Sequence, residues 1–433
     1  MNRYSNVMVR KILGNFGVRL MSAIINLMIA IVVSQYLGAT GKGEQSIVLT
    51  MIAIVTIFDN MVGGASIVFL TNKLPIRELF FVSYIWTIFV SLLSYVVLIT
   101  LNLVPSQFTL SVVLLSAISS VISIHSSVLL GKEKLRSFNL LSFLVPLLTL
   151  LMLLVQFAWN LNRTASAYVN ALYFAYLLTG IVSVLLVAKS VRKDATFQLL
   201  NTWKSFQSLI YYGFQNQLAH VFQLLSFRMS YFFLEKNCGE AQVGIYSNAV
   251  SVIESVWMIS TSISLWQYAK IANSTDVHYT KKITEQLTKY GLLVAFFALM
   301  CVVLIPAGFY SWLFGKDFRG LNELMWFLAP GIWVFNYALI LGHYFSGHGK
   351  YYVNAFASGV GLIVTCIASY FLIPTYQTTG AAISASLSYL VTSIVVIVFF
   401  RKEGAKFVVF PSIQELKETL SLLKVSTKSG ANS

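Results

Sequence analysis

Twelve long apolar runs follow one another along the chain, separated by short polar stretches. Each run is close to the ~20 residues that a helix needs to cross ~30 Å of hydrocarbon. Hydrophobic residues make up 57% of the 433 residues and charged residues only 10%, whereas roughly 25% of an ordinary globular domain is charged. The sequence therefore predicts a polytopic membrane protein with spans at 14–36, 46–70, 79–101, 108–130, 138–158, 165–188, 207–234, 243–269, 290–313, 323–346, 354–374 and 379–400.

The length of the runs also predicts the kind of membrane protein. Every backbone polar group must be paired inside lipid, which leaves helices or closed barrels. Runs this long and continuous exceed barrel strands, so the expected fold class is all-α. Of the three cysteines, Cys238 falls in an outer loop and Cys301 and Cys366 inside spans, so no disulfide framework is expected. The polar, basic start of the chain, 1–13, does not predict a cleavable signal.

The basic residues predict the orientation in the membrane. Of the 30 lysines and arginines, 23 fall on one side, in the two terminal stretches and in alternate connections. The other side holds five: Lys42, Arg163, Lys236, Lys316 and Arg319. Cytoplasmic loops carry such an excess, so both termini are expected in the cytoplasm. The net charge of +15 is then a topology signal that faces anionic membrane lipids, and nucleic-acid binding is not expected.

A short pattern occurs twice, after the first span and after the seventh. Five positions agree at a constant offset of 201 residues: Gly38, Gly43, Ser46, Ile52 and Val55 against Gly239, Gly244, Ser247, Ile253 and Val256. Because each copy follows the first helix of a six-helix half, the pattern predicts an internally duplicated transporter. We expect two six-helix bundles related by a pseudo-two-fold axis, 1–188 and 207–400, joined by a cytoplasmic linker, 189–206.

The stretch after the last span, 401–433, predicts a cytoplasmic amphipathic tail. Ser412 and Glu415 have the spacing of a capping box. The helix that they open would carry an apolar face made of Ile413, Leu416, Leu420 and Leu423. A helix that lies on the inner membrane surface and a helix that binds a partner both fit this pattern.

Four stretches of the chain resemble a known transporter family. They are Gln35-Tyr36-Leu37-Gly38 through Gly43, Gly239 to Ser247, Leu313 to Phe318, and Leu372-Ile373-Pro374 through Gly380-Ala381-Ala382 to Ser388-Tyr389-Leu390. Their order and spacing are similar to those of the polysaccharide transporter branch of the multidrug/oligosaccharidyl-lipid/polysaccharide (MOP) exporter superfamily, which includes the Wzx-type O-antigen flippases. The resemblance implies a fold like that of the MATE transporters, transport by alternating access without an enzymatic reaction, and a bacterial inner membrane.

Ionisable side chains inside the spans are the candidates for function. A central charge costs about 2.5–3.5 kcal/mol on insertion scales, so such a group is expected to face a cavity or a partner. At ~1.5 Å per residue, Asp59 and Glu254 lie ~16–20 Å from an interface, near the midplane. Asn216, His220 and Gln223 fall at i, i+4 and i+7 and form a polar stripe that is expected to line water or cargo. The ionisable candidates are Arg19, Asp59, His125, His220, Arg228 and Glu254.

Two arrangements of these charges fit the sequence. In one, each arginine is neutralised by a carboxylate of its own half, giving the pairs Arg19/Asp59 and Arg228/Glu254. In the other, the arginines face a central cavity and contact a phosphorylated cargo, to which a guanidinium is suited. Asp59, Glu254 or His125 would then carry a coupling ion, H⁺ or Na⁺. We favour a mixture, in which the arginines contact cargo in one state and carboxylates in another.

The resemblance implies a flippase that moves an undecaprenyl-diphosphate-linked oligosaccharide, such as an O-antigen repeat unit, from the cytoplasmic to the outer leaflet. The implied partners are this lipid-linked oligosaccharide, a polysaccharide polymerase and the chain-length machinery. The alternative is a cation-coupled multidrug exporter of the same fold, although Arg19 and Arg228 would repel a cationic drug. A membrane glycosyltransferase is not expected, because the outer loops are short and the sequence holds no catalytic or metal-ligating cluster.

Overall fold

The computed structural model describes residues 2–159, 163–191, 202–272 and 276–405. The regular elements in these ranges are all helical, as expected for a chain whose backbone groups must be paired inside hydrocarbon. In chain order they are α1 (Asn2–Asp59), η1 (Asn60–Val62), α2 (Gly64–Leu70), α3 (Ile76–Leu101), η2 (Ser106–Phe108), α4 (Thr109–Gly131), α5 (Leu135–Ala158), α6 (Ala165–Val191), α7 (Thr202–Cys238), α8 (Glu240–Glu254), α9 (Trp257–Ala272), α10 (Val277–Val303), α11 (Ala307–Phe314), η4 (Lys316–Phe318), α12 (Leu321–Gly347) and α13 (Tyr351–Lys402). The predicted tail helix lies outside the described residues.

The helices account for the twelve predicted spans. In the described part of the chain, 8 helical segments are long and apolar enough to cross a membrane. Two of them, Leu20–Leu70 and Tyr351–Lys402, each contain two spans joined at a bend or break. The remaining two spans are α7, which is long but polar, and α8 with α9, which are short helices that follow each other directly. The prediction of an all-α polytopic fold is confirmed.

Glycines turn the chain at the positions where the repeated pattern begins. α1 bends at Gly38 (φ 67°), and Gly239 (φ 84°) separates α7 from α8. Glycine adopts such a φ without steric cost, which explains why the same residue stands at both places. α13 bends instead at Gln377 (φ 50°), three residues after Pro374.

Two predicted spans are interrupted near their middle. The span predicted at 243–269 breaks between α8 and α9, where Ser255 Oγ donates to the Val252 carbonyl (2.6 Å) and competes with the helical backbone pattern. The span predicted at 46–70 breaks after α1, where η1 and the positive φ of Gly64 (49°) precede α2. A continuous apolar run does not reveal such a break, because the residues around it are still compatible with hydrocarbon.

α10 begins earlier than the span predicted at 290–313. Its first residue is Val277, because Asp276 accepts hydrogen bonds from the backbone N–H groups of His278 (2.9 Å) and Tyr279 (3.1 Å) and caps the helix. The first turns of α10 contain lysines and buried threonines. The length of the apolar run therefore underestimates the length of this helix.

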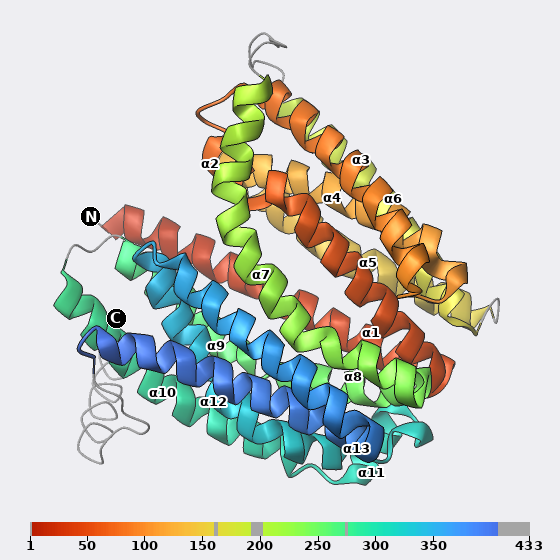
Figure 1. Cartoon of the computed structure of the whole chain (residues 1–433). Helices are drawn as coiled ribbons and strands as arrows, with labels where there is room; N and C mark the ends of the chain where they lie inside the picture. Colours follow the sequence, from red (N-terminus) through yellow and green to blue (C-terminus); the bar gives the residue numbers. More distant parts are fainter. Residues whose placement is uncertain (1, 160–162, 192–201, 273–275, 406–433) are drawn as a thin grey trace, which may run out of the picture.

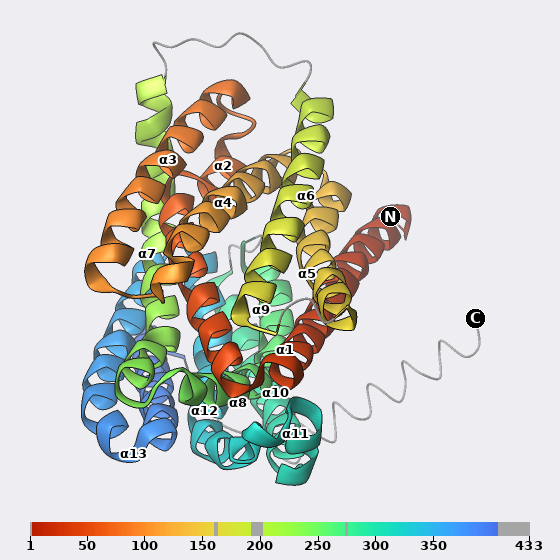
Figure 2. The same cartoon turned by 90° about the vertical axis from the view of Figure 1, so that its right-hand side faces the viewer.

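The helices form two groups that are joined at one end (Figures 1 and 2). α2 to α6 make up one group and α8 to α13 the other, while α1 and α7 contact both. In Figure 1 the groups meet near α8 and diverge toward the ends that carry the α2–α3 and α12–α13 connections. We call the part of the bundle where the groups diverge the basic end. Its connections belong to the side on which most of the lysines and arginines fall. The unit boundaries 1–188 and 207–400 stay a prediction.

α1 and α8 cross where the two copies of the repeated pattern meet. Ser46 Oγ donates to Ser247 Oγ (2.8 Å), so equivalent positions of the two copies are in contact. A Cβ atom on Gly43 would lie 1.8 Å from the carbonyl oxygen of Glu240, and one on Gly244 would lie 1.9 Å from a carbonyl oxygen of α1. Both glycines are therefore required by the close approach of two backbones.

Further polar contacts join the groups beside this crossing. Asn248 Nδ2 donates to Ser34 Oγ (2.6 Å), and Gln35 Nε2 donates to the Leu313 carbonyl (2.8 Å). Asp317 Oδ2 accepts from the first backbone N–H after the bend of α1 (3.3 Å). The end of the bundle opposite the basic end is therefore closed by hydrogen bonds between segments far apart in the sequence.

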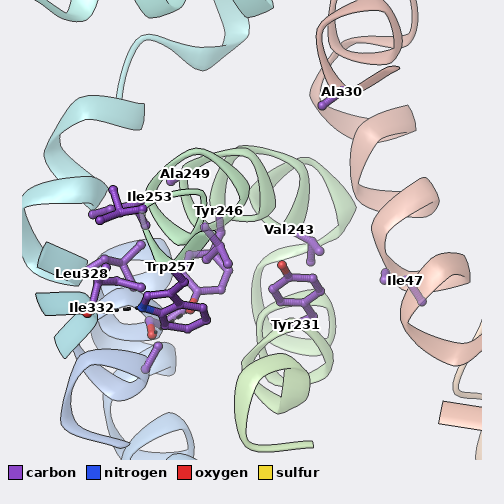
Figure 3. Packing of buried hydrophobic residues seen from close by; sticks show 14 of the residues in the cluster. Ala30, Ile47, Tyr231, Val243, Tyr246, Ala249, Ile253, Trp257, Leu328 and Ile332 are labelled. Atoms are coloured by element: carbon purple, nitrogen blue, oxygen red, sulfur yellow. Dashed lines mark hydrogen bonds between the residues drawn. The ribbon is translucent and has the colours of Figure 1, made fainter. Parts of the chain in front are cut away.

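Aromatic rings pack together in the second group, and Figure 3 shows one of them, Trp257, beside Ile332. The indole of Trp257 donates to the Ile332 carbonyl (3.2 Å). Its ring centroid lies 4.8 Å from that of Phe335, 5.2 Å from that of Phe227 and 5.4 Å from that of Tyr389. These rings come from α7, α9, α12 and α13, so the cluster locks four helices together at one depth.

Cysteines at Ser46 and Ser247 are expected to form a disulfide, because the two Oγ atoms are 2.8 Å apart and a disulfide needs Cα atoms within ~4.4–6.8 Å. The measurement uses isolated membranes, with a protease site placed in 192–201 and the three free native cysteines replaced by serine. After mild oxidation and cleavage, the two fragments should stay together on a non-reducing gel.

The control pair combines Ser46→Cys with Ser255→Cys. Position 255 lies about 12 Å beyond position 247 along the direction of α8. Fragments of this control should separate. Equal linking of the two pairs, or linking of neither, would contradict the crossing.

Candidate functional site

A cavity of about 760 Å³ lies at the basic end, between α2, α7, α12 and α13. Its walls come from the parts of these helices that adjoin the basic connections. Its volume falls within the ~300–1,000 Å³ of typical ligand sites. The polar and aromatic lining residues are Phe69, Tyr211, Tyr212, His220, Gln223, Phe335, His343, Ser346, Tyr351, Asn354, Ser358 and Thr392.

α7 directs its polar residues to two places. His220 and Gln223 lie one turn apart and line the cavity. Further along, Ser226 Oγ lies 2.8 Å from Ser388 Oγ, and Ser230 forms a hydrogen bond of 3.1 Å with another serine of α13. The polar residues of α7 therefore fall into two sets. One set lines the cavity near the basic end, and the other forms interhelical hydrogen bonds further along the helix. Contact of His220 and Gln223 with a cargo stays a prediction.

The described residues that line the cavity include no carboxylate. Asn354 Nδ2 donates to the Gly342 carbonyl (2.9 Å) and to Ser346 Oγ (3.0 Å), which holds its amide in one orientation. At the mouth, the rings of Phe69 and Tyr212 lie 4.7 Å apart. Hydroxyls, amides, imidazoles and ring faces suit a polyhydroxyl or anionic ligand better than a cation.

Arg228 and Glu254 form a bidentate ion pair beneath the cavity. Arg228 Nη1 donates to Oε1 (3.1 Å) and Nη2 to Oε2 (2.9 Å) of Glu254. Tyr389 also donates to Oε1 (3.2 Å), and its ring lies 5.3 Å from that of Phe335, which lines the cavity. One aromatic layer thus separates the ion pair from the cavity. The expected pairing is present, while a contact between Arg228 and cargo stays a prediction.

Asp59 lies in the other group, where the helix is interrupted. It is 4% exposed, and its Oδ2 accepts a hydrogen bond from Ser120. Its Oδ1 and the hydroxyl of Thr56, one turn earlier, are buried without a hydrogen-bond partner in the described part of the chain. Glu254 likewise ends a helical segment. Interrupted helices near the midplane are where transporters bind coupling ions, so both carboxylates stay candidates.

The other predicted residues lie away from the cavity or outside the description. His125 is buried, with one ring nitrogen 2.6 Å from the Tyr84 hydroxyl and the other 2.6 Å from Ser183 Oγ. Both nitrogens have protein partners, an arrangement typical of a structural histidine, and its coupling role stays a prediction. The side chains of Arg19 and Asn216 lie outside the described part of the structure.

Two residues were not foreseen from the sequence. His343 lines the cavity from α12 and would have been found by searching every predicted span for histidine. Lys42 was assigned to an outer loop, because it falls between the spans predicted at 14–36 and 46–70. It lies instead in a helical turn of α1, 5% exposed, with Nζ donating to Gln45 Oε1 (2.7 Å). Among the described residues, no cluster of His, Cys, Asp and Glu is suited to hold a metal ion.

No protein-family model matches the chain. Two curated proteins are similar to parts of it. One is the capsular polysaccharide biosynthesis protein CapF of Staphylococcus aureus, 26% identical over 172 residues. The other is a putative O-antigen transporter of Shigella flexneri, 25% identical over 241 residues. The matches cover 39% and 54% of this chain, and 43% and 55% of the relatives, so the chain spans about half the length of the curated relatives it matches.

Solved structures match almost the whole chain. The lipid II flippase MurJ in an inward closed conformation has a TM-score of 0.74 at 12% identity, covering 94% of this chain and 90% of that chain. An inward-facing multidrug resistance MATE family transporter of the MOP superfamily has a TM-score of 0.63 at 16% identity, covering 88% and 94%. The chain shares its fold with this flippase and this transporter, so the expected class of fold is confirmed.

Neutralising one partner of the ion pair is expected to destabilise the fold, because it leaves the other charge buried. Arg228→Met or Glu254→Gln should each cost about 3–5 kcal/mol, whereas the double variant should recover most of this. Thermal unfolding of the purified variants in detergent measures the effect.

The control is Lys350→Met, which removes a 2.5 Å ion pair to Glu403 in which the lysine side chain is 40% exposed. It should change stability by less than about 1 kcal/mol. A double variant as unstable as the single variants would contradict the role of the pair as a brace.

Proposed function

We propose that the protein is a flippase that moves an undecaprenyl-diphosphate-linked oligosaccharide from the cytoplasmic to the outer leaflet of a bacterial inner membrane. The cavity at the basic end carries this proposal: its described lining offers hydroxyls, amides and aromatic rings and no carboxylate. These groups suit the hydroxyls and ring faces of a glycan. The similarity to a putative O-antigen transporter and the fold shared with the lipid II flippase support the same class.

The orientation follows from the distribution of lysine and arginine. With the basic end in the cytoplasm, both termini are cytoplasmic and the cavity receives cargo from the inner leaflet. The glycan and diphosphate occupy the cavity, while the polyprenyl tail stays in the bilayer. The polymerase and the chain-length machinery are the proposed partners that take the cargo on the outer side.

Transport by alternating access requires the closed end to open. The proposed moving units are 1–188 and 207–400, connected by 189–206. As they rock, the hydrogen bonds at the α1–α8 crossing, such as that between Ser46 and Ser247, break, and the basic end closes around the aromatic residues at the mouth.

One observation favours a second candidate, a cation-coupled exporter of small molecules. The unpartnered Oδ1 of Asp59 is a buried anionic group in the described part of the chain that a proton or Na⁺ would stabilise. A coupling ion at this place is also compatible with the flippase, so the carboxylate alone does not identify the cargo.

Cells that lack the protein are expected to accumulate a completed lipid-linked oligosaccharide on the inner leaflet, because the cargo is made there and cannot cross unaided. Extraction and mass analysis of polyprenyl-diphosphate lipids measures this accumulation and names the glycan. The wild type should reverse the accumulation. Arg228→Glu should not, because it places two carboxylates together beneath the cavity.

The matched control is Lys236→Glu, a charge reversal at the exposed end of the same helix, which should restore export. Both variants must be present in the membrane at the wild-type level. Absence of any accumulated lipid would contradict the flippase and favour small-molecule export. Normal export by Arg228→Glu would remove Arg228 from the mechanism.

Asp59→Asn is expected to weaken the dependence of transport on an ion gradient if Asp59 holds the coupling ion. The measurement compares export in cells with and without a protonophore, and at low and high external Na⁺. The neutral amide keeps the hydrogen bond with Ser120 and cannot release a proton. A gradient dependence equal to that of the wild type would exclude Asp59 as the ion carrier.

A further inference from the structure

We propose that His220 and His343 together form a proton-dependent binding site for the phosphoryl groups of the cargo. The inference rests on the proposed function and names the groups that recognise the diphosphate. His220 projects from α7 and His343 from α12, and both line the same cavity. Two elements far apart in the sequence thus bring two imidazoles to one wall.

A diphosphate that enters this cavity needs positive charge. An anion that leaves water without a counter-charge carries a cost of several kcal/mol. The described lining residues include no lysine or arginine, and Arg228 beneath the floor is already neutralised by Glu254. Among the described lining residues, the two histidines are the side chains that can take up a proton and become positive. Protonation of this pair therefore supplies the counter-charge.

The hydrogen bonds of His343 show where the proton is gained. Its Nδ1 lies 2.9 Å from the Leu339 carbonyl, and since a carbonyl only accepts, Nδ1 carries the proton of the neutral ring. Protonation then occurs at Nε2 and turns this atom into a donor. Ser346, whose Oγ accepts a hydrogen bond from Asn354 Nδ2 (3.0 Å), also lines the cavity and can donate its hydroxyl proton to a phosphoryl oxygen.

Other ionisable groups lie around the pair. The other titratable groups that line the cavity are Tyr211 and Tyr212 of α7 and Tyr351 of α13. The Lys73 ammonium lies 3.3 Å from the ring centroid of Phe69, which lines the cavity from α2. A tyrosine is ordinarily neutral well above pH 8. The nearest opposite charges in the spans, Arg228 and Glu254, cancel each other.

The sign of the pH dependence follows from this arrangement. The anion stabilises the protonated imidazoles, so binding takes up protons and affinity falls as the pH rises. Uptake of one proton gives at most a tenfold change in affinity per pH unit. Between about pH 6 and about pH 8 we expect affinity for a polyprenyl diphosphate to fall by about tenfold or more.

The experiment measures binding to the full-length protein in nanodiscs. The probe is farnesyl diphosphate, farnesol is the uncharged control, and inorganic pyrophosphate is the competitor. Calorimetry near pH 6 and pH 8, in two buffers of different ionisation enthalpy, gives both the affinity and the number of protons taken up. The expected result is proton uptake with farnesyl diphosphate, displacement by pyrophosphate and weak binding of farnesol.

Variants assign the effect to the pair. The double variant His220→Gln/His343→Gln should bind near pH 6 as weakly as the wild type does near pH 8, and should take up no proton. The double variant His220→Arg/His343→Arg, which carries a permanent charge at both positions, should bind equally well at both values. The control is His278→Gln, an exposed histidine at the start of α10 that should keep the wild-type behaviour.

Three results would overturn the inference. They are equal affinity of the wild type at both pH values, a full pH dependence in the double variant, and farnesol binding as tight as farnesyl diphosphate. Failure of the proposed function is distinguishable, because it appears as missing lipid accumulation in cells. If the double glutamine variant reverses the accumulation as completely as the wild type over the same pH range, the histidine site is refuted. The proposal that the protein is a flippase then still stands.

Discussion

The arrangement of the whole bundle depends on one close contact between two backbones. At the α1–α8 crossing no side chain separates the chains, since a Cβ on Gly43 would sit 1.8 Å from a carbonyl oxygen of the opposite helix. Dispersion and hydrogen bonding, rather than expulsion of water, hold helices together in lipid, and both strengthen with close approach. This contact closes one end of the bundle, and the opposite end is left to diverge around the cavity. The two copies of the repeated pattern contact each other here, so residues that define the pattern also form the closed end.

The cost of polar groups in hydrocarbon explains how the remaining charges are arranged. Arg228 and Glu254 satisfy each other through two hydrogen bonds and sit behind a layer of aromatic rings. The cavity is lined by neutral polar groups, which need no counter-charge when no cargo is present. A permanent charge facing this cavity would have to be desolvated at every cycle, whereas an imidazole can take up its charge together with the anion. Under this account the ion pair stabilises the bundle and the imidazoles meet the cargo.

Much of the fold was predictable, because the length of the apolar runs and the uneven distribution of lysine and arginine depend directly on how the chain crosses the membrane. The glycine turns at Gly38 and Gly239 were predictable as well, since a sharp turn selects glycine. The helix breaks after Asp59 and Glu254 were not, because they depend on hydroxyls and glycines that compete locally with the helix and leave no trace in hydropathy. The site was foreseen only in part: His220 and Gln223 stand in a periodic stripe, whereas His343 lies on another helix, and only the packing of α7 against α12 and α13 brings it to the same cavity.

The central claim is that a lipid-linked oligosaccharide passes between two groups that must separate at the α1–α8 crossing. The most direct measurement reconstitutes the purified protein in liposomes with a fluorescent polyprenyl-diphosphate oligosaccharide and follows its exposure to an impermeant quencher. The account predicts transfer between leaflets by the wild type, arrest when Ser46→Cys/Ser247→Cys is oxidised, and recovery after reduction. Transfer that continues through the oxidised, cross-linked protein, or no transfer by the wild type, would contradict it.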